Sequence, residues 1–133
     1  MEKDRYAPLL TVPVFFAIDM LWLGYLARNF YKSQLHHLLS PKVNWPAAFL
    51  FYFIYIAGIL FFAVRPGLAT QSLGVACLYG ALFGFFTYAT YDLTNLATLP
   101  NWPIKVVLVD IAWGTLLCTL VAAISTMIGN RLQ

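Results

Sequence analysis

Apolar residues in this chain fall into four long runs that are separated by short polar clusters. A helix rises 1.5 Å per residue, so about 20 residues cross the hydrocarbon core of a bilayer. Backbone polar groups in lipid must be bonded within their own segment, and the runs show no strand-like alternation, so each run predicts a helix. The predicted spans are 7–28, 46–64, 68–91 and 104–128.

The ends of these runs carry local signals of helix starts and turns. The same tripeptide, Asn44-Trp45-Pro46 and Asn101-Trp102-Pro103, precedes the second and fourth runs. Proline suits the first turn of a helix, and tryptophan favours the lipid–water interface. Arg65-Pro66-Gly67 predicts a tight turn between the second and third helices. The pattern predicts an all-α fold, an integral membrane four-helix bundle that forms one domain over residues 1–133.

Composition supports a membrane protein and argues against two other classes. Of the 133 residues, 62% are hydrophobic and 10% are charged. Soluble domains carry about a quarter charged residues, and a small domain exposes much of its surface to water. The net charge of +3 comes from scattered residues rather than a basic patch, so no nucleic-acid partner is expected.

The segment between the first two spans, residues 29–43, has an amphipathic pattern. Its apolar positions recur at helical spacing and its other positions are polar, which predicts a short helix lying on the membrane interface. Such a helix would be placed to cover a site between the spans. The apolar positions are Tyr31, Leu35, Leu38 and Leu39, and the polar ones are Lys32, Gln34, His36 and His37.

Metal and cofactor chemistry has little support in the sequence. His36 and His37 are adjacent, so on a helix their side chains point apart, and a third ligand is not evident. Cys77 and Cys118 both fall inside predicted spans, where buried thiols are the expected state. We therefore expect no metal site and no cofactor.

Three aspartates fall in the half of the membrane opposite the chain termini, which we call the far half. Asp19 lies nine residues before Arg28, about 13 Å inside the far face, and Asp110 lies six residues after Ile104, about 9 Å inside it. Asp92 is expected at the far face itself. Ionisable residues within spans are costly and mark functional sites, although a carboxyl that only hydrogen-bonds a neighbouring helix is the alternative.

Aromatic and polar neighbours accompany these aspartates. Asp19 and Trp22, like Asp110 and Trp113, are three residues apart and share a helix face. A polar stripe on the third helix contains Gly84 and continues towards the far face. The candidate ligand-binding residues are Asp19, Trp22, Tyr88, Asp92, Asn95, Asp110 and Trp113.

A small-residue motif, Gly80 and Gly84, allows close contact between helices. It predicts that the third helix lies at the centre of the bundle. The same face offers a contact for a homodimer.

Three segments resemble a known family. They are residues 88–114, reading YATYDLTNLATLPNWPIKVVLVDIAWG, residues 18–31, reading IDMLWLGYLARNFY, and residues 44–58, reading NWPAAFLFYFIYIAG. Together they are similar to bacterial membrane proteins of domain-of-unknown-function family 2177. The resemblance implies four helices, a bacterial inner-membrane location and gene neighbours that act in fatty-acyl modification and the oxidative-stress response. It implies no particular activity.

Orientation does not follow from charge, because four Lys or Arg residues lie near each face. Since an even-numbered bundle commonly has both termini in the cytoplasm, we expect that orientation here.

Three classes of function follow from these observations. The favoured one is a protein that binds a membrane lipid or a small amphiphile in an acidic and aromatic cleft, as an accessory to lipid modification or membrane stress. A small oligomeric transporter or proton-coupled carrier would use the aspartates as cation or proton sites. An intramembrane enzyme acting on lipid is the third, but no Ser/His/Asp order, HExxH motif or phosphate-binding glycine loop is found.

Overall fold

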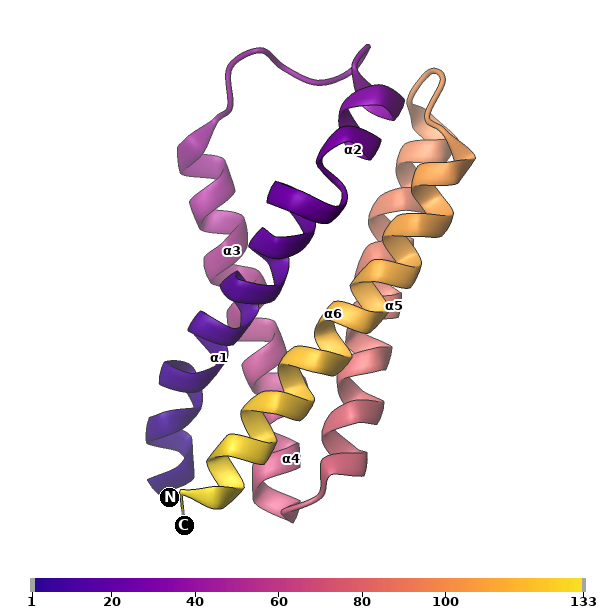
Figure 1. Ribbon diagram of the computed structural model, residues 1–133. Helices are drawn as coiled ribbons and strands as arrows, with labels where there is room; N and C mark the ends of the chain where they lie inside the picture. Colours follow the sequence, from indigo (N-terminus) through magenta and orange to yellow (C-terminus); the bar gives the residue numbers. More distant parts are fainter. Residues whose placement is uncertain (1, 133) are drawn as a thin grey trace.

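The computed structural model describes residues 2–132, and successive long helices run antiparallel to each other (Figure 1). Four helices in this part of the chain are long and apolar enough to cross a membrane: Arg5–Leu26, Trp45–Thr70, Leu73–Thr98 and Ile104–Arg131. The predicted all-α membrane bundle is therefore confirmed. The elements are α1 (Glu2–Leu21), the π-helix η1 (Trp22–Leu26), α2 (Arg28–Leu35), α3 (Trp45–Ile59), the π-helix η2 (Leu60–Val64), α4 (Arg65–Thr70), α5 (Leu73–Thr98) and α6 (Ile104–Arg131).

Both chain ends lie at one end of the bundle, together with the turn after α4 (Figure 1). We call this end the terminal face. The opposite end, the far face, carries α2, the connection from α2 to α3 and the loop between α5 and α6. Much of the surface between the faces is apolar: Leu9, Phe53 and Leu108 are each at least 66% exposed. Such a surface suits lipid rather than water.

The second span continues beyond the tight turn predicted at residues 65–67, so that prediction is wrong. Proline lacks an N–H, and its ring clashes with the carbonyl group four residues earlier in an α-helix. The π-helix η2 ends two residues before Pro66 and loosens the helix at this point, which lets the chain continue as α4. The turn lies instead at Gln71, whose φ is 53°, and Ser72, whose side chain accepts a hydrogen bond from the Val75 N–H.

The third span is longer than predicted, because α5 ends at Thr98 rather than at residue 91. Asp92 therefore lies within the helix, six residues or about 9 Å from its far end. Asp110 lies at the corresponding depth, six residues after the start of α6. The expected position of Asp92 at the membrane surface is corrected to one inside the span, where it is fully buried.

The connector contains a shorter helix than the pattern predicts. The helical path breaks at Ala27, where φ is −114°, and α2 then spans only Arg28–Leu35. Leu35 is buried with Trp102, Val106 and Val107 on the far side of the bundle. The short helix therefore packs on the loop before α6 and on the first turn of α6. Its position at the membrane interface stays a prediction.

The closest helix contact is between α5 and α6. A Cβ atom added at Gly80 would lie 2.6 Å from the Cys118 carbonyl oxygen, and one at Gly84 would collide with the carbonyl of Gly114. The Gly80/Gly84 face is thus covered by α6 of the same chain, and a homodimer, which stays a prediction, would need another surface.

The central helix is α6 rather than the predicted third helix. In the apolar 18-residue stretch of α6, 39% is buried inside the bundle, against 22% in the corresponding stretch of α5. Its buried positions run from Val106 to Gly129, nearly its whole length.

Candidate functional site

A cavity of about 180 Å³ lies in the far half, where α1, η1, α2, α3, α5 and α6 meet. At about 30 Å³ per water molecule, it has room for about six waters or for a small head group. The cavity, which we call the acidic cavity, brings together residues that are as far apart as 94 positions in the sequence. Five predicted site residues line it, namely Asp19, Trp22, Tyr88, Asp110 and Trp113, and so do Leu23, Tyr31, Phe51 and Tyr52.

Two of the predicted aspartates face this cavity from separate helices. Asp19 of α1 is 4% exposed and Asp110 of α6 is 7% exposed. The Tyr52 hydroxyl donates to Asp19 Oδ2 at 3.3 Å. The Tyr31 hydroxyl donates to Asp110 Oδ1. The far ends of these helices thus place two carboxyl groups against one small volume.

Tyr31 links three elements through its hydroxyl group. It accepts a hydrogen bond from Trp22 Nε1 at 3.1 Å while it donates to Asp110. Burial raises the pKa of the Tyr31 phenol, and the hydrogen bond to Asp110 raises that pKa further. The hydroxyl group therefore stays protonated and remains a donor over the physiological range. Through this side chain α2 contributes to the wall of the acidic cavity.

The two tryptophans that follow the aspartates stack on each other. The ring centroids of Trp22 and Trp113 are 4.4 Å apart and the planes are 8° from parallel. Trp113 is 9% exposed, and its indole N–H makes no hydrogen bond within residues 2–132, although it lies towards Asp19. The pair holds the end of the first span against α6 and forms one wall of the cavity.

Asp92 lies behind the cavity rather than in its wall. It is fully buried, and Asp110 and the indole of Trp102 lie beside it. Neither of its carboxyl oxygens has a hydrogen-bond partner at normal distance in the described chain. Asn95, the remaining predicted site residue, is half-buried near the Tyr91 hydroxyl and does not line the cavity.

Sequence reasoning did not include Tyr31 and Tyr52, which line the cavity, or Trp102, which lies beside Asp92 behind it. Tyr31 carried a signal, because it lies on the apolar side of the amphipathic connector. Tyr52 and Trp102 carried none. The first is one of many aromatic residues in its apolar run, and the second had the signature of an interface anchor.

A groove of about 450 Å³ adjoins the acidic cavity between α3 and α5. It shares Phe51 and Tyr88 with the cavity and is completed by Tyr55, Thr87 and Tyr91. The groove forms because the first part of α3 stands away from α5 (Figure 1). The buried residues of α3 begin only at Tyr55, which donates or accepts a hydrogen bond with Thr87 Oγ1 at 2.8 Å.

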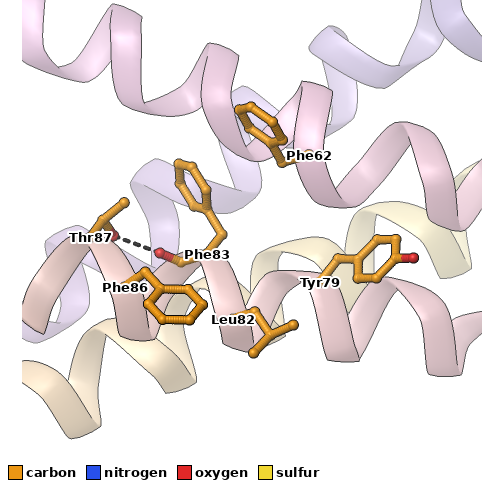
Figure 2. Close-up of a pocket in the computed structure, with 6 residues that line it drawn as sticks. All are labelled: Phe62, Tyr79, Leu82, Phe83, Phe86 and Thr87. Atoms are coloured by element: carbon orange, nitrogen blue, oxygen red, sulfur yellow. Dashed lines mark hydrogen bonds between the residues drawn. The ribbon is translucent and has the colours of Figure 1, made fainter.

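A further hollow of about 360 Å³ continues along α5 towards the terminal face (Figure 2). Thr87 belongs to both this hollow and the groove. Its hydroxyl group donates to the Phe83 carbonyl oxygen at 2.8 Å (Figure 2). The rest of the lining is mainly aromatic: Phe62, Tyr79, Leu82, Phe83 and Phe86.

The histidine pair makes backbone contacts at the far face. His36 Nδ1 is 3.1 Å from the Ser33 carbonyl oxygen, and His37 Nε2 is 3.1 Å from that of Asn101. Over the residues that the structure describes, no three His, Cys, Asp or Glu side chains are grouped to hold a metal ion.

Comparison with known proteins identifies a family. A family model described as a predicted membrane protein (DUF2177) matches residues 6–127, which include every residue of the acidic cavity. Neither the curated proteins nor the solved structures contain a significant match. With most of its length matched, the chain belongs to the DUF2177 family of membrane proteins.

Proposed function

We propose that this protein binds a membrane lipid or a small amphiphile, with the polar head in the acidic cavity and the aliphatic chain in the groove between α3 and α5. The observation that carries the proposal is the shared wall: Phe51 and Tyr88 line both the polar cavity and the apolar groove. An amphiphile has the same division into a polar and an apolar part. Its chain would meet aromatic rings, and its head would meet carboxyl oxygens.

The proposal also accounts for polar groups that have too few partners. An ionised carboxylate offers about four acceptor positions. Asp19 and Asp110 each have one hydrogen bond from a tyrosine, and Trp113 has an N–H near the cavity. Buried polar groups without partners cost free energy, and a bound head group would supply what they lack.

We place the protein in a bacterial inner membrane with both termini in the cytoplasm, so that the acidic cavity lies in the outer half of the bilayer. In that position it would serve as an accessory to lipid modification or to the response to membrane stress, as the family resemblance suggests. Reporter fusions at the C-terminus and in the 36–44 connection test the orientation.

Binding itself can be tested by native mass spectrometry of the protein released from dodecyl maltoside micelles. We expect lipid or amphiphile adducts on the wild type and a loss of about ten- to hundredfold in affinity for Asp19→Asn and Asp110→Asn, the range of a hydrogen bond to a charged group. Asn95→Ala is the matched control, because Asn95 lies outside the cavity. Full binding by both aspartate variants would refute the proposal.

A second candidate function, a proton-coupled carrier, is favoured by Asp92. This carboxyl group is fully buried beside Asp110 and has no hydrogen-bond partner at normal distance in the described residues. Neighbouring carboxyl groups that cannot both be ionised are typical of proton sites in membranes. Proteoliposome measurements test it: proton flux that depends on a gradient and disappears in Asp92→Asn supports a carrier, and flux equal to that of empty vesicles counts against one.

A further inference from the structure

We infer that the head group taken by the acidic cavity is an ammonium group on an aliphatic chain, and that it reaches the cavity sideways from the lipid between α3 and α5. This inference rests on the proposed function, because it names the chemical class of ligand for the same site. It depends on the charge of the cavity, on its aromatic walls and on the path of the groove.

The charge of the cavity selects a cation. Asp19 and Asp110 both line it, and Asp92 lies directly behind Asp110. The lining, all of it within the described residues, contains no Lys, Arg or His. A carboxyl group in a low-dielectric region keeps its negative charge only beside a positive partner, and neither an anionic head group nor a neutral hydroxyl supplies one. An ammonium group offsets that charge and, when it is primary, donates to the free acceptor positions.

The walls of the cavity suit the same ligand. Six of the nine lining residues are aromatic, and they come from five different elements. A cation over an aromatic face is attracted by the ring quadrupole, most strongly over tryptophan, and desolvation strengthens the attraction. A cage of rings with a carboxylate at its base is a common way of recognising ammonium groups. The stacked pair of Trp22 and Trp113 keeps one side of this cage rigid.

The groove gives the aliphatic chain a defined path. It leaves the cavity between Phe51 and Tyr88, passes Thr87 and continues into the hollow shown in Figure 2 as far as Tyr79. From Tyr88 to Tyr79 is nine residues of α5, or about 13 Å along the helix towards the terminal face. At the exit from the cavity, the hollow between α1 and α3 is a poorer route, because it shares only Tyr52 with the cavity whereas the groove shares Phe51 and Tyr88.

The test is a fluorescence titration of the purified protein in dodecyl maltoside, which carries no charge. Trp45 is 60% exposed, so the titration uses a Trp45→Phe background in which Trp22 and Trp113 report more of the signal. The probes share a ten-carbon chain: decylamine, decyltrimethylammonium, decanol and decyl sulfate. We expect the two ammonium compounds to bind at least about tenfold more tightly than decanol, and decyl sulfate to bind most weakly.

One double variant and one pair of single variants separate the parts of the inference. Asp19→Asn combined with Asp110→Asn should remove the preference for ammonium compounds. Thr87→Phe, which fills the groove, should weaken binding about tenfold, whereas Ala57→Phe in the hollow between α1 and α3 should leave it unchanged. Each variant is first required to melt cooperatively in the same micelles. Thr87→Val, which removes the hydroxyl group without filling the groove, is the size control for Thr87→Phe.

The outcomes distinguish this inference from the proposed function. Equal affinity for decanol and decyltrimethylammonium, lost in the aspartate variant, would overturn the ammonium assignment and leave amphiphile binding intact. Weaker binding by Ala57→Phe than by Thr87→Phe would overturn the route. No saturable signal with any probe would overturn both proposals. Competition by phosphatidylethanolamine would identify a membrane lipid as the source of the ammonium group, and binding of decylamine without such competition would identify a free amphiphile.

Discussion

The two halves of the bundle are built on different principles. In the terminal half, small and aliphatic side chains pack closely; they include Ala63, Val64, Leu68, Ala76 and Ala122, all at most 1% exposed. In the far half, α3 stands away from α5 (Figure 1), and the space is lined by rings and carboxyl groups. Small residues let backbones approach in lipid, where no hydrophobic force drives helices together.

We infer from this difference that the terminal half provides the stability of the bundle and that the far half provides the binding site. Close contacts along α5 and α6 hold the bundle together, so the far half can leave polar groups with few partners. Buried carboxyl groups and open grooves reduce stability, and proteins keep such features where function requires them. The predictions below test this division, starting with the largest expected effect.

Replacing Gly84 should damage the close contact between α5 and α6 most. In Gly84→Leu the new side chain meets the Gly114 carbonyl and Cys118, and a backbone atom on the facing helix cannot move aside. We expect a loss of about 3 kcal/mol in the free energy of unfolding, measured in mixed micelles of increasing sodium dodecyl sulfate. Gly24→Leu is the control, because nothing lies within 4 Å of its Cβ position. Equal losses in the two variants would break the comparison.

Neutralising an aspartate of the acidic cavity should have the opposite effect, a large loss of affinity with little loss of stability. Asp110→Asn keeps the shape of the side chain and removes a buried charge, so the free energy of unfolding should change by less than about 1 kcal/mol. Amphiphile affinity should fall about ten- to hundredfold. Unfolding and binding are measured on the same preparation. A variant that unfolds readily but binds normally would show that Asp110 is structural.

The Tyr31 hydroxyl should contribute a smaller, local effect. Tyr31→Phe removes the hydroxyl group that donates to Asp110 and accepts from Trp22. We expect the free energy of unfolding to fall by about 1.5 kcal/mol. Amide hydrogen exchange should rise in α2 and remain unchanged in α6. Tyr25→Phe serves as the control, because Tyr25 is 77% exposed. Unchanged exchange in α2 would mean that Tyr31 does not hold this helix over the cavity.

The smallest expected effect is on pH dependence. The pKa of Tyr31 is raised in the folded protein by burial and by Asp110, above the value of about 10 for an unperturbed tyrosine. A group with a raised pKa contributes stability that is complete below its unfolded pKa and is lost as the pH rises through its folded pKa. The difference in stability between wild type and Tyr31→Phe should therefore be constant from pH 7 to pH 9 and decline above about pH 10. A change between pH 7 and pH 9 would contradict this assignment.

The spans could be predicted from the sequence because run length and charge position fix them, but two of their ends could not. An Arg-Pro-Gly sequence normally ends a helix, and the π-helix before Pro66 is not visible in the sequence. The polar segment after Tyr91 also suggested an end. In α5, however, the hydroxyls of Thr90, Thr94 and Thr98 donate to carbonyls four residues earlier, so these polar side chains are satisfied within the helix.

The candidate site was predictable where its signal was local. Each Asp–Trp pair is three residues apart on one helix, so its shared face follows from helix geometry. The contacts of Tyr31 with Asp110 and of Tyr52 with Asp19 join residues 79 and 33 positions apart. Such contacts depend on how the helices cross, and a single sequence does not contain that information.

The central claim is that Asp19 and Asp110 act on one ligand in one cavity. A double-mutant cycle on decyltrimethylammonium affinity, with Asp19→Asn, Asp110→Asn and the double variant, tests it most directly. Residues that share a partner are energetically coupled, whereas distant independent residues give additive effects. We predict that each single change weakens binding about tenfold or more and that the double variant loses clearly less than the product of the two. Strictly additive losses, or no loss from either change, would contradict the claim.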